Sequence, residues 1–226
     1  MTNKYFKKVK EDKLNYKNTV VNQIFSSVSK KYDLMNDLMS FGFHTSWKNK
    51  VAEILDVDKK KIILDLASGS GDITYILKEN YNCKCISYDS NLDMLKIAKK
   101  KLKSFKPILI NGQAESLPFK NQFLDGVVVS FGLRNFDNIS ASLKECKRVL
   151  KKKGKFICLE FSEVNNPTLR KFINIYYKII PKYGSIITKN KLAYTYLIES
   201  IKRFPNQIEL TKKIGKVGLK NVKVID

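Results

Sequence analysis

The stretch Leu64-Asp65-Leu66-Ala67-Ser68-Gly69-Ser70-Gly71-Asp72 decides the fold of this 226-residue chain. It leads from a short apolar run into a glycine-rich turn, where the backbone can approach a ligand closely and offer N–H groups at the start of a helix. Asp89 ends the next apolar run, where a carboxylate can accept hydrogen bonds from both hydroxyls of a ribose. A strand-end cap is the alternative for Asp89. The stretch therefore predicts a nucleoside-binding turn beside a parallel sheet.

From residue 61 onward, short apolar runs alternate with amphipathic segments, a pattern typical of a parallel sheet covered by helices on both faces. We expect strands over residues 61–66, 84–89, 107–111, 124–130 and 155–161. We expect helices over residues 72–80, 91–103 and 138–150, with Asn91 and Asn138 as N-caps of the last two. The run Lys151-Lys152-Lys153-Gly154 is then a turn that ends the third helix.

The chain has a different character on either side of this alternation. Apolar residues recur at helical spacing over residues 18–31 and 46–55. Residues 165–204 carry two aromatic-rich helical stretches around Pro181, which indicate an inserted cap, and a helix over 206–217 and a strand over 221–225 follow. We therefore expect a single α/β domain. Its parts are an N-terminal helical segment (1–58), a Rossmann-like core with a mostly parallel sheet and helices on both faces (59–164), a helical cap (165–204) and a C-terminal helix and strand (205–226).

Asp65 helps to choose between two ligands that suit such a turn. A carboxylate inside a strand is costly to bury unless it meets a cation or donors, so the ammonium group of S-adenosylmethionine (AdoMet) suits it and a dinucleotide pyrophosphate does not. The turn also keeps only Gly69 and Gly71 of the dinucleotide motif, since Thr74 replaces the third glycine. Downstream, the polar stretch that begins at Gln113 could bracket an adenine, with a plain surface loop as the alternative.

Lysine dominates the charge of the chain, whose formal net charge is +22. Such an excess suits nucleic acid or an anionic membrane surface, but arginines are few and the lysines are spread over nearly every segment. We therefore favour a composition bias and expect no nucleic-acid partner. The four cysteines suit free thiols in a reducing compartment, and without a Cys or His pair at zinc spacing we expect no metal. No apolar run approaches the roughly 20 residues of a membrane-spanning helix.

Two segments outside the glycine turn carry the motifs of a known family. The first is Tyr32-Asp33-Leu34-Met35-Asn36 with Ser40, His44 and Trp47, and the second runs from Arg148 to Gly154 and continues in Glu160-Phe161-Ser162. On these motifs the sequence resembles the ubiquinone/menaquinone biosynthesis C-methyltransferases of the UbiE type. The first motif matches in full, whereas Lys152-Lys153-Gly154 stands where the second usually has Pro-Gly-Gly. Similar stretches at 130–135 and 199–205 extend the resemblance over nearly the whole chain.

This resemblance implies a class I AdoMet-dependent methyltransferase that methylates a ring carbon of a polyprenyl benzoquinol in ubiquinone biosynthesis, of the 2-methoxy-6-polyprenyl-1,4-benzoquinol type. The demethylmenaquinone methyltransferase of the menaquinone branch is the alternative. Tyr32 is implied to help close the N-terminal segment over the cofactor, and the implied AdoMet contacts come from Ser70, Asp89, Gln113, Ala114 and Ser130. Family members continue with one more strand, so we expect the last strand of the family's sheet to be missing here.

Methyl transfer to a quinol ring needs no protein nucleophile, so the enzyme has to position the ring, exclude water and stabilise a developing phenolate. Arg134 is the first candidate for the electrostatic role and Asn135 the second, because a guanidinium remains charged and can polarise a phenol. A helix C-cap or a salt bridge is the alternative for Arg134. For His44 the alternatives are a functional role and plain helix packing.

The tail of a polyprenylated quinol needs an apolar channel, for which the cap offers an apolar stripe, with core packing as the alternative: Leu169, Phe172, Ile173, Tyr176, Tyr177, Ile179 and Ile180. If the cap reaches lipid, its lysines favour an anionic membrane surface. We expect the matrix side of the mitochondrial inner membrane in a eukaryote, and the cytoplasm or the cytoplasmic membrane surface in a bacterium. A quinone-synthesis complex and a homodimer are candidate assemblies. An RNA methyltransferase and an inactive scaffold are the alternative functions.

Overall fold

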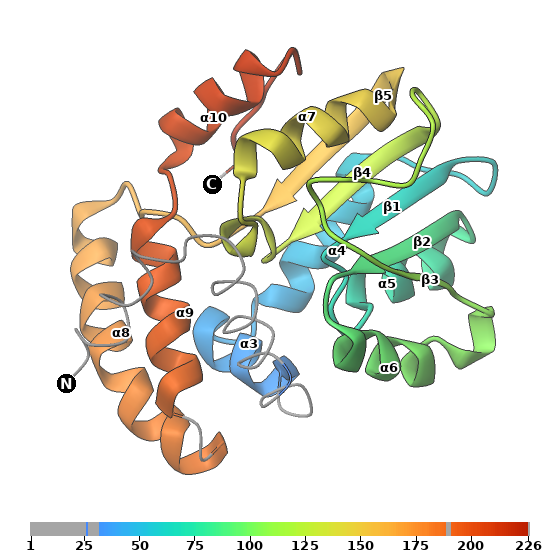
Figure 1. The fold of residues 1–226 in the computed structure, drawn as a ribbon. Helices are drawn as coiled ribbons and strands as arrows, with labels where there is room; N and C mark the ends of the chain where they lie inside the picture. The colour runs from blue at the N-terminus through green and yellow to red at the C-terminus, as the bar shows by residue number, and fades with distance from the viewer. Residues whose placement is uncertain (1–25, 27–31, 189–190, 226) are drawn as a thin grey trace, which may run out of the picture.

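The fold centres on one five-stranded parallel sheet with the strand order β3-β2-β1-β4-β5 (Figure 1). The computed structural model describes residue 26, residues 32–188 and residues 191–225. Strand order reverses between β1 and β4, the place where open α/β sheets bind their ligands. The strands are β1 Ile62–Leu66, β2 Lys84–Asp89, β3 Ile108–Asn111, β4 Leu124–Ser130 and β5 Leu150–Leu159.

Helices cover both faces of the sheet and extend beyond its carboxyl edge. Figure 1 shows α3, α8 and α9 beyond the arrowheads of the strands, which places this helical layer over the edge where a ligand would bind. The α-helices are α3 Tyr32–Ser40, α4 His44–Leu55, α5 Asp72–Tyr81, α6 Leu92–Lys101, α7 Ile139–Val149, α8 Pro167–Thr188, α9 Lys191–Arg203 and α10 Gln207–Lys216. The short 3-10 helices are η2 Lys103–Phe105 and η3 Leu133–Asn135.

The central strands are buried on both faces, which explains their continuous apolar sequences. Ile63 of β1 and Val128 of β4 pack in a cluster with residues of α4 and α5 on one face. Leu64 and Val127, their neighbours in sequence, pack in a cluster with residues of α7 on the other. Side chains alternate between the faces of a strand, so each strand contributes to both clusters. The expected parallel sheet with a helical layer on each face is confirmed.

The predicted asparagine caps are confirmed where the structure describes them. Asn91 Oδ1 accepts hydrogen bonds from the backbone N–H groups of Asp93 and Met94 at 2.9 and 3.1 Å. Asn138 Oδ1 accepts from Ala141 N at 3.0 Å. Each cap satisfies backbone donors that the first turn of a helix leaves without a partner. The two caps therefore fix where α6 and α7 begin.

The prediction that Lys151-Lys152-Lys153-Gly154 is a turn is wrong. Helix α7 ends at Val149 and β5 begins at Leu150, so the run belongs to the strand. The register shifts between the Leu124 and Gly126 pairings, and the three lysines are exposed there. A bulge and lysines are both typical of an edge strand, because they block pairing with another chain. In composition the lysines resemble a helix C-terminus, which is why their role was misassigned from the sequence.

Two further predictions near the C-terminus are wrong. Helix α8 continues through Pro181 to Thr188 instead of breaking around the proline. No strand is assigned to residues 221–225, because a strand needs a hydrogen-bonding neighbour and none of the described strands pairs with this segment. The helix predicted over residues 18–31 lies outside the described residues, apart from Ser26.

Candidate functional site

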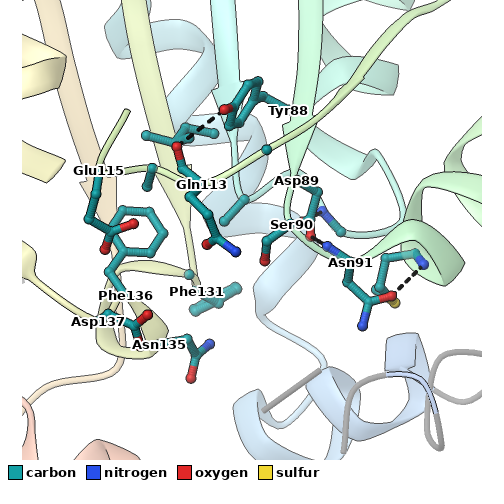
Figure 2. A pocket seen from close by; sticks show the side chains of 17 residues that line it. Tyr88, Asp89, Ser90, Asn91, Gln113, Glu115, Phe131, Asn135, Phe136 and Asp137 are labelled. Carbon is teal, nitrogen blue, oxygen red and sulfur yellow. Dashed lines mark hydrogen bonds between the residues drawn. The ribbon is translucent and has the colours of Figure 1, made fainter. Parts of the chain in front are cut away.

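The carboxyl ends of β1, β2 and β4 surround the larger of two neighbouring cavities. With the solvent-open space at its mouth it measures about 680 Å³. Asp89 and Gln113 lie on its walls, and in Figure 2 the side chain of Gln113 extends into the space between Asp89 and Glu115. Ala114, Phe131 and Asn135 also line this cavity. The cavity lies at the switch point of the sheet, where the sequence predicted a nucleoside.

Asp89 is buried and held by the backbone around it. Its Oδ2 accepts a hydrogen bond from Gly69 N at 2.8 Å, and its Oδ1 accepts from Asn91 N at 2.8 Å. Burial raises the pKa of Asp89 above its usual range, although the backbone N–H groups work against that rise. A carboxylate fixed in this way can accept hydrogen bonds from a diol without moving, which is what a ribose requires.

Another wall of the larger cavity is the loop that follows β3, and Tyr88 holds it against the sheet. The Tyr88 hydroxyl donates to the backbone oxygen of Gln113 at 3.1 Å. A Cβ atom at Gly112 would lie 2.0 Å from that hydroxyl, so no larger residue fits there. Gln113 and Ala114 are thereby presented to the cavity by a fixed backbone. The position of this loop depends on Gly112 and Tyr88, neither of which the sequence had suggested.

The smaller cavity, about 290 Å³ with the solvent-open space at its mouth, shares Ala67, Gly69 and Phe131 with the larger one. Ala67 and Gly69 have positive φ angles of 58° and 55°, which turn the chain sharply after β1. The cavity's remaining walls carry charges and hydroxyls: Lys48, Asp65, Ser68, Ser70, Asp72 and Ser130, together with Ile73. A ligand that spans both cavities must therefore pass over the glycine turn.

Asp65 is 1 % exposed and receives its hydrogen bonds from Thr74. The Thr74 hydroxyl and backbone N–H donate to Asp65 Oδ2 at 2.8 and 3.1 Å. Burial raises the pKa of Asp65 from 3.8 to about 7, with smaller contributions from Asp72 and Asp89, while Thr74 works against the rise. Thr74 occupies the position where the dinucleotide motif has its third glycine. The residue that distinguishes this turn from a dinucleotide site therefore also donates hydrogen bonds to the Asp65 carboxyl group.

Two hydroxyls beside Asp65 are buried without a hydrogen-bond partner among the residues that the structure describes: Ser68 Oγ and Ser130 Oγ. Ser70 also lies on this wall, and its hydroxyl donates to Asp72 Oδ1 at 3.2 Å. A buried polar group without a partner costs free energy unless a ligand or water satisfies it. The smaller cavity therefore has the chemistry of a polar binding site.

Lys48 lines the same cavity and was missed by the sequence analysis. Its Nζ donates to Asp72 Oδ2 at 2.5 Å and lies 3.2 Å from His44 Nδ1. The other ring nitrogen of His44, Nε2, lies 2.9 Å from Asp37 Oδ1. His44 and Lys48 are four residues apart on one helix, a spacing that places them side by side. That spacing was the available signal, but nothing in the sequence linked it to Asp72.

The comparisons with known proteins agree with this geometry. A profile of the ubiE/COQ5 methyltransferase family matches residues 8–225. The chain belongs to the ubiE/COQ5 methyltransferase family. A relative named ubiquinone/menaquinone biosynthesis C-methyltransferase UbiE from Rickettsia bellii is 45% identical over 232 residues, which cover 98% of this chain and 92% of the relative. The protein of the same name from Wigglesworthia glossinidia brevipalpis is 43% identical over 233 residues, which cover 100% of this chain and 92% of the relative.

Solved structures support the fold alone. A SAM-dependent methyltransferase from Thermotoga maritima aligns with a TM-score of 0.61 at 22% identity, over 87% of this chain and 79% of that one. The match agrees with a class I methyltransferase fold, which confirms the predicted fold class. With its family, the fold makes this chain an AdoMet-dependent methyltransferase.

Within this methyltransferase, the structure separates the two predicted catalytic residues. Asn135 lines the larger cavity, and its Oδ1 accepts a hydrogen bond from Tyr196 Oη at 3.0 Å. Arg134 lines neither cavity. Its Nη1 donates to Glu160 Oε2 at 2.6 Å and to Phe131 O at 2.7 Å, inside the protein. The salt bridge that was the alternative for Arg134 is therefore present, while its catalytic role stays a prediction.

Of two other predicted cofactor-binding residues, Gly71 lies away from the cavities and Tyr32 stays a prediction. Gly71 lines neither cavity, and a Cβ atom there would lie 2.9 Å from Leu102 Cδ1, so the residue serves the packing of α5 against α6. Tyr32 begins α3, but its side chain lies outside what the structure describes. Among the described residues, no group of three or more His, Cys, Asp or Glu side chains is placed to hold a metal ion.

Proposed function

We propose that this methyltransferase binds AdoMet across the two cavities and methylates a ring carbon of a polyprenyl benzoquinol in ubiquinone biosynthesis. The observation that carries the proposal is that two cavities of different chemistry meet at the glycine turn. One cavity has a fixed carboxylate and a polar loop, which suit a nucleoside, and the other has charges and hydroxyls, which suit an amino acid. AdoMet combines these two parts in one molecule.

The residues on each side fit the parts of AdoMet. In the larger cavity Asp89 would hold the ribose, and Gln113 and Ala114 would bracket the adenine. In the smaller cavity Asp65 would take the ammonium group. Ser70 and Ser130 have hydroxyls on the same wall, and that of Ser130 is buried without a partner among the described residues. Gly69, which lines both cavities, would lie beneath the centre of the ligand.

When bound, AdoMet would supply an electrophilic methyl group; its transfer from the sulfonium to the ring carbon would leave S-adenosylhomocysteine, and the ring would release the proton that the methyl group replaces. The chain's own contribution is an aromatic wall, formed by Phe131 and backed by two further rings. Phe131 lines both cavities and lies 4.7 Å from Phe161 and 6.5 Å from Trp47, measured between ring centroids. Such a wall orients an aromatic ring and excludes water. Asn135 lies near it as a polar group for a quinol hydroxyl.

The quinol class comes from the relatives, whose names combine the ubiquinone and menaquinone pathways. Purified protein should therefore be given AdoMet with a short-tailed demethylated benzoquinol, and separately with the matching naphthoquinol. We expect methyl incorporation into the benzoquinol to exceed that into the naphthoquinol. Faster methylation of the naphthoquinol would move the assignment to the menaquinone branch, and no methylation of either would contradict the proposed substrate class.

The outer face of the cap supports a membrane surface as the source of the substrate. Of the predicted apolar stripe, Leu169, Phe172 and Ile179 are exposed on α8, whereas Ile180 is buried in the cluster with α9. No helix in the described part of the chain is long and apolar enough to cross a bilayer. We propose that these exposed residues, in a chain with a formal net charge of +22, bind an anionic membrane peripherally.

Sedimentation with vesicles tests this membrane contact. The variant Phe172→Ser should sediment less with anionic vesicles than the wild type. Ile208→Ser is the matched control, because Ile208 is an equally exposed apolar residue on α10. Equal sedimentation of the two variants and the wild type, or binding that is insensitive to salt and lipid charge, would contradict the proposal.

A further inference from the structure

Lys48 is a lysine inside the protein rather than on its surface. It is 4 % exposed, although it lies in the middle of the amphipathic helix α4. A buried ammonium group is costly unless partners compensate its charge. The described partners are Asp72 and His44, which account for two of its three donor hydrogens. Lys48 also lines the smaller cavity, so it faces the proposed cofactor site.

Asp72 does not fully neutralise Lys48, because it is shared with a second lysine. Asp72 Oδ2 accepts from Lys48, and its Oδ1 accepts from Lys101. Burial alone would raise the pKa of Asp72, yet the two lysines lower it to about 2, so the carboxylate remains ionised. Two cations and one anion leave one net positive charge. Lys101 does not line the cavity, so Lys48 is the member of the group that presents this charge to a ligand.

The opposite charge lies on the same cavity. Asp65 is placed to take an ammonium group, and its hydrogen-bond donors come from Thr74 rather than from Lys48. Ser68 adds a buried hydroxyl with no partner among the described residues. A cavity with an anion, a cation and a buried hydroxyl has the chemistry that recognises an α-amino acid zwitterion.

We propose that Lys48 binds the carboxylate of the methionine part of AdoMet. The inference rests on the AdoMet site proposed above and adds a residue of α4, far in sequence from the glycine turn. The contact from His44 fits the tautomer in which Nδ1 accepts from Lys48 and Nε2 donates to Asp37. Both ring nitrogens of His44 are then engaged, which keeps the lysine beside the cavity.

Two ligands that differ only in the carboxylate test this contact by calorimetry. AdoMet and decarboxylated AdoMet should be titrated into the full chain and into Lys48→Met. We expect K48M to weaken AdoMet about 10- to 100-fold, the range of a charge-assisted hydrogen bond, and to change decarboxylated AdoMet by less than about threefold. Lys101→Met is the matched control, since it removes the other cation of Asp72, and it should change both affinities by less than about threefold.

Comparing the two ligands distinguishes a wrong role for Lys48 from a wrong AdoMet site. Equal losses for both ligands in K48M, or an unchanged AdoMet affinity, would overturn the role of Lys48. If neither ligand binds the wild type, the proposed AdoMet site itself fails. Should K48M not unfold cooperatively, Lys48→Gln replaces it in the same titrations, because glutamine can still donate to Asp72.

Discussion

Replacing Asp65 with asparagine separates the cost of the buried carboxyl group from its use in binding. The pKa of Asp65 is raised from 3.8 to about 7 because the side chain is buried. A folded-state pKa above the unfolded value means that the folded protein holds a proton that the unfolded chain releases. The contribution of Asp65 to the stability of the unliganded protein should therefore fall as pH rises from about 4 to about 7, and then level off.

The magnitude follows from the two pKa values. Their difference corresponds to about 4 kcal/mol once the carboxyl group is fully ionised, of which about 2–3 kcal/mol develops between pH 5 and pH 8. The amide that Asp65→Asn introduces has no proton to lose and keeps an oxygen that can accept from Thr74. Its new N–H groups lack a charged partner, at a cost of about 1–3 kcal/mol. Asp65→Asn should thus gain stability relative to the wild type as the pH rises.

Urea unfolding of both proteins at pH 5, 6, 7 and 8, without AdoMet, measures this difference. Asp89 and Glu160, whose pKa values burial also raises, are present in both proteins and cancel to first order. At pH 8 the same variant should bind AdoMet at least about tenfold more weakly, because the ammonium group loses its counter-charge. A difference in unfolding free energy that is flat with pH would refute the reasoning about Asp65.

Three further substitutions address the surrounding structure. Asp89→Asn should weaken AdoMet and 5′-methylthioadenosine by similar factors of about ten or more, because both contain the ribose; calorimetry that finds only AdoMet affected would contradict the assignment. Gly132→Ala should cost about 1–3 kcal/mol in urea unfolding, since the new Cβ atom would lie 2.5 Å from Ala67 Cβ, and an unchanged midpoint would show that the turn adapts. Arg134→Met should cost about 3–5 kcal/mol because Glu160 stays buried without its cation, and adding Glu160→Leu should recover most of it. Turnover by that folded double variant decides the catalytic role: unchanged turnover would remove Arg134 from the mechanism, and a loss of tenfold or more would support it.

Local pattern predicted the parts of the fold that depend on local interactions. The strands at 84–89 and 124–130 have the predicted bounds, and Asn91 and Asn138 cap the helices as expected. These features depend on apolar runs and on bonds to residues two or three positions away. The same reasoning was wrong for the run Lys151-Lys152-Lys153-Gly154, because it lies at the register shift of β5 against β4, which no local pattern encodes.

The site itself divides in the same way. Asp89 could be predicted because the order of strands and helices places the carboxyl end of β2 next to that of β1, beside the switch point. Lys48 could not, because its partner Asp72 belongs to another helix and becomes a neighbour only when α4 packs against α5. A salt bridge was the alternative for Arg134, but its partner Glu160 could not be named for a related reason: the two residues follow different strands.

Buried charges can be sorted by whether the chain neutralises them. Arg134 and Glu160 form a close ion pair inside the protein and line neither cavity, which is the arrangement expected of a structural pair. Asp65 has no salt bridge to any described residue, and only Thr74 offers it hydrogen bonds. Among the described residues no cation compensates this carboxyl group, and its ionised form inside a central strand is stabilised by a cation. We propose that the ammonium group of AdoMet is this cation, and the pH dependence of Asp65→Asn measures how much free energy the uncompensated carboxyl group costs the unliganded protein.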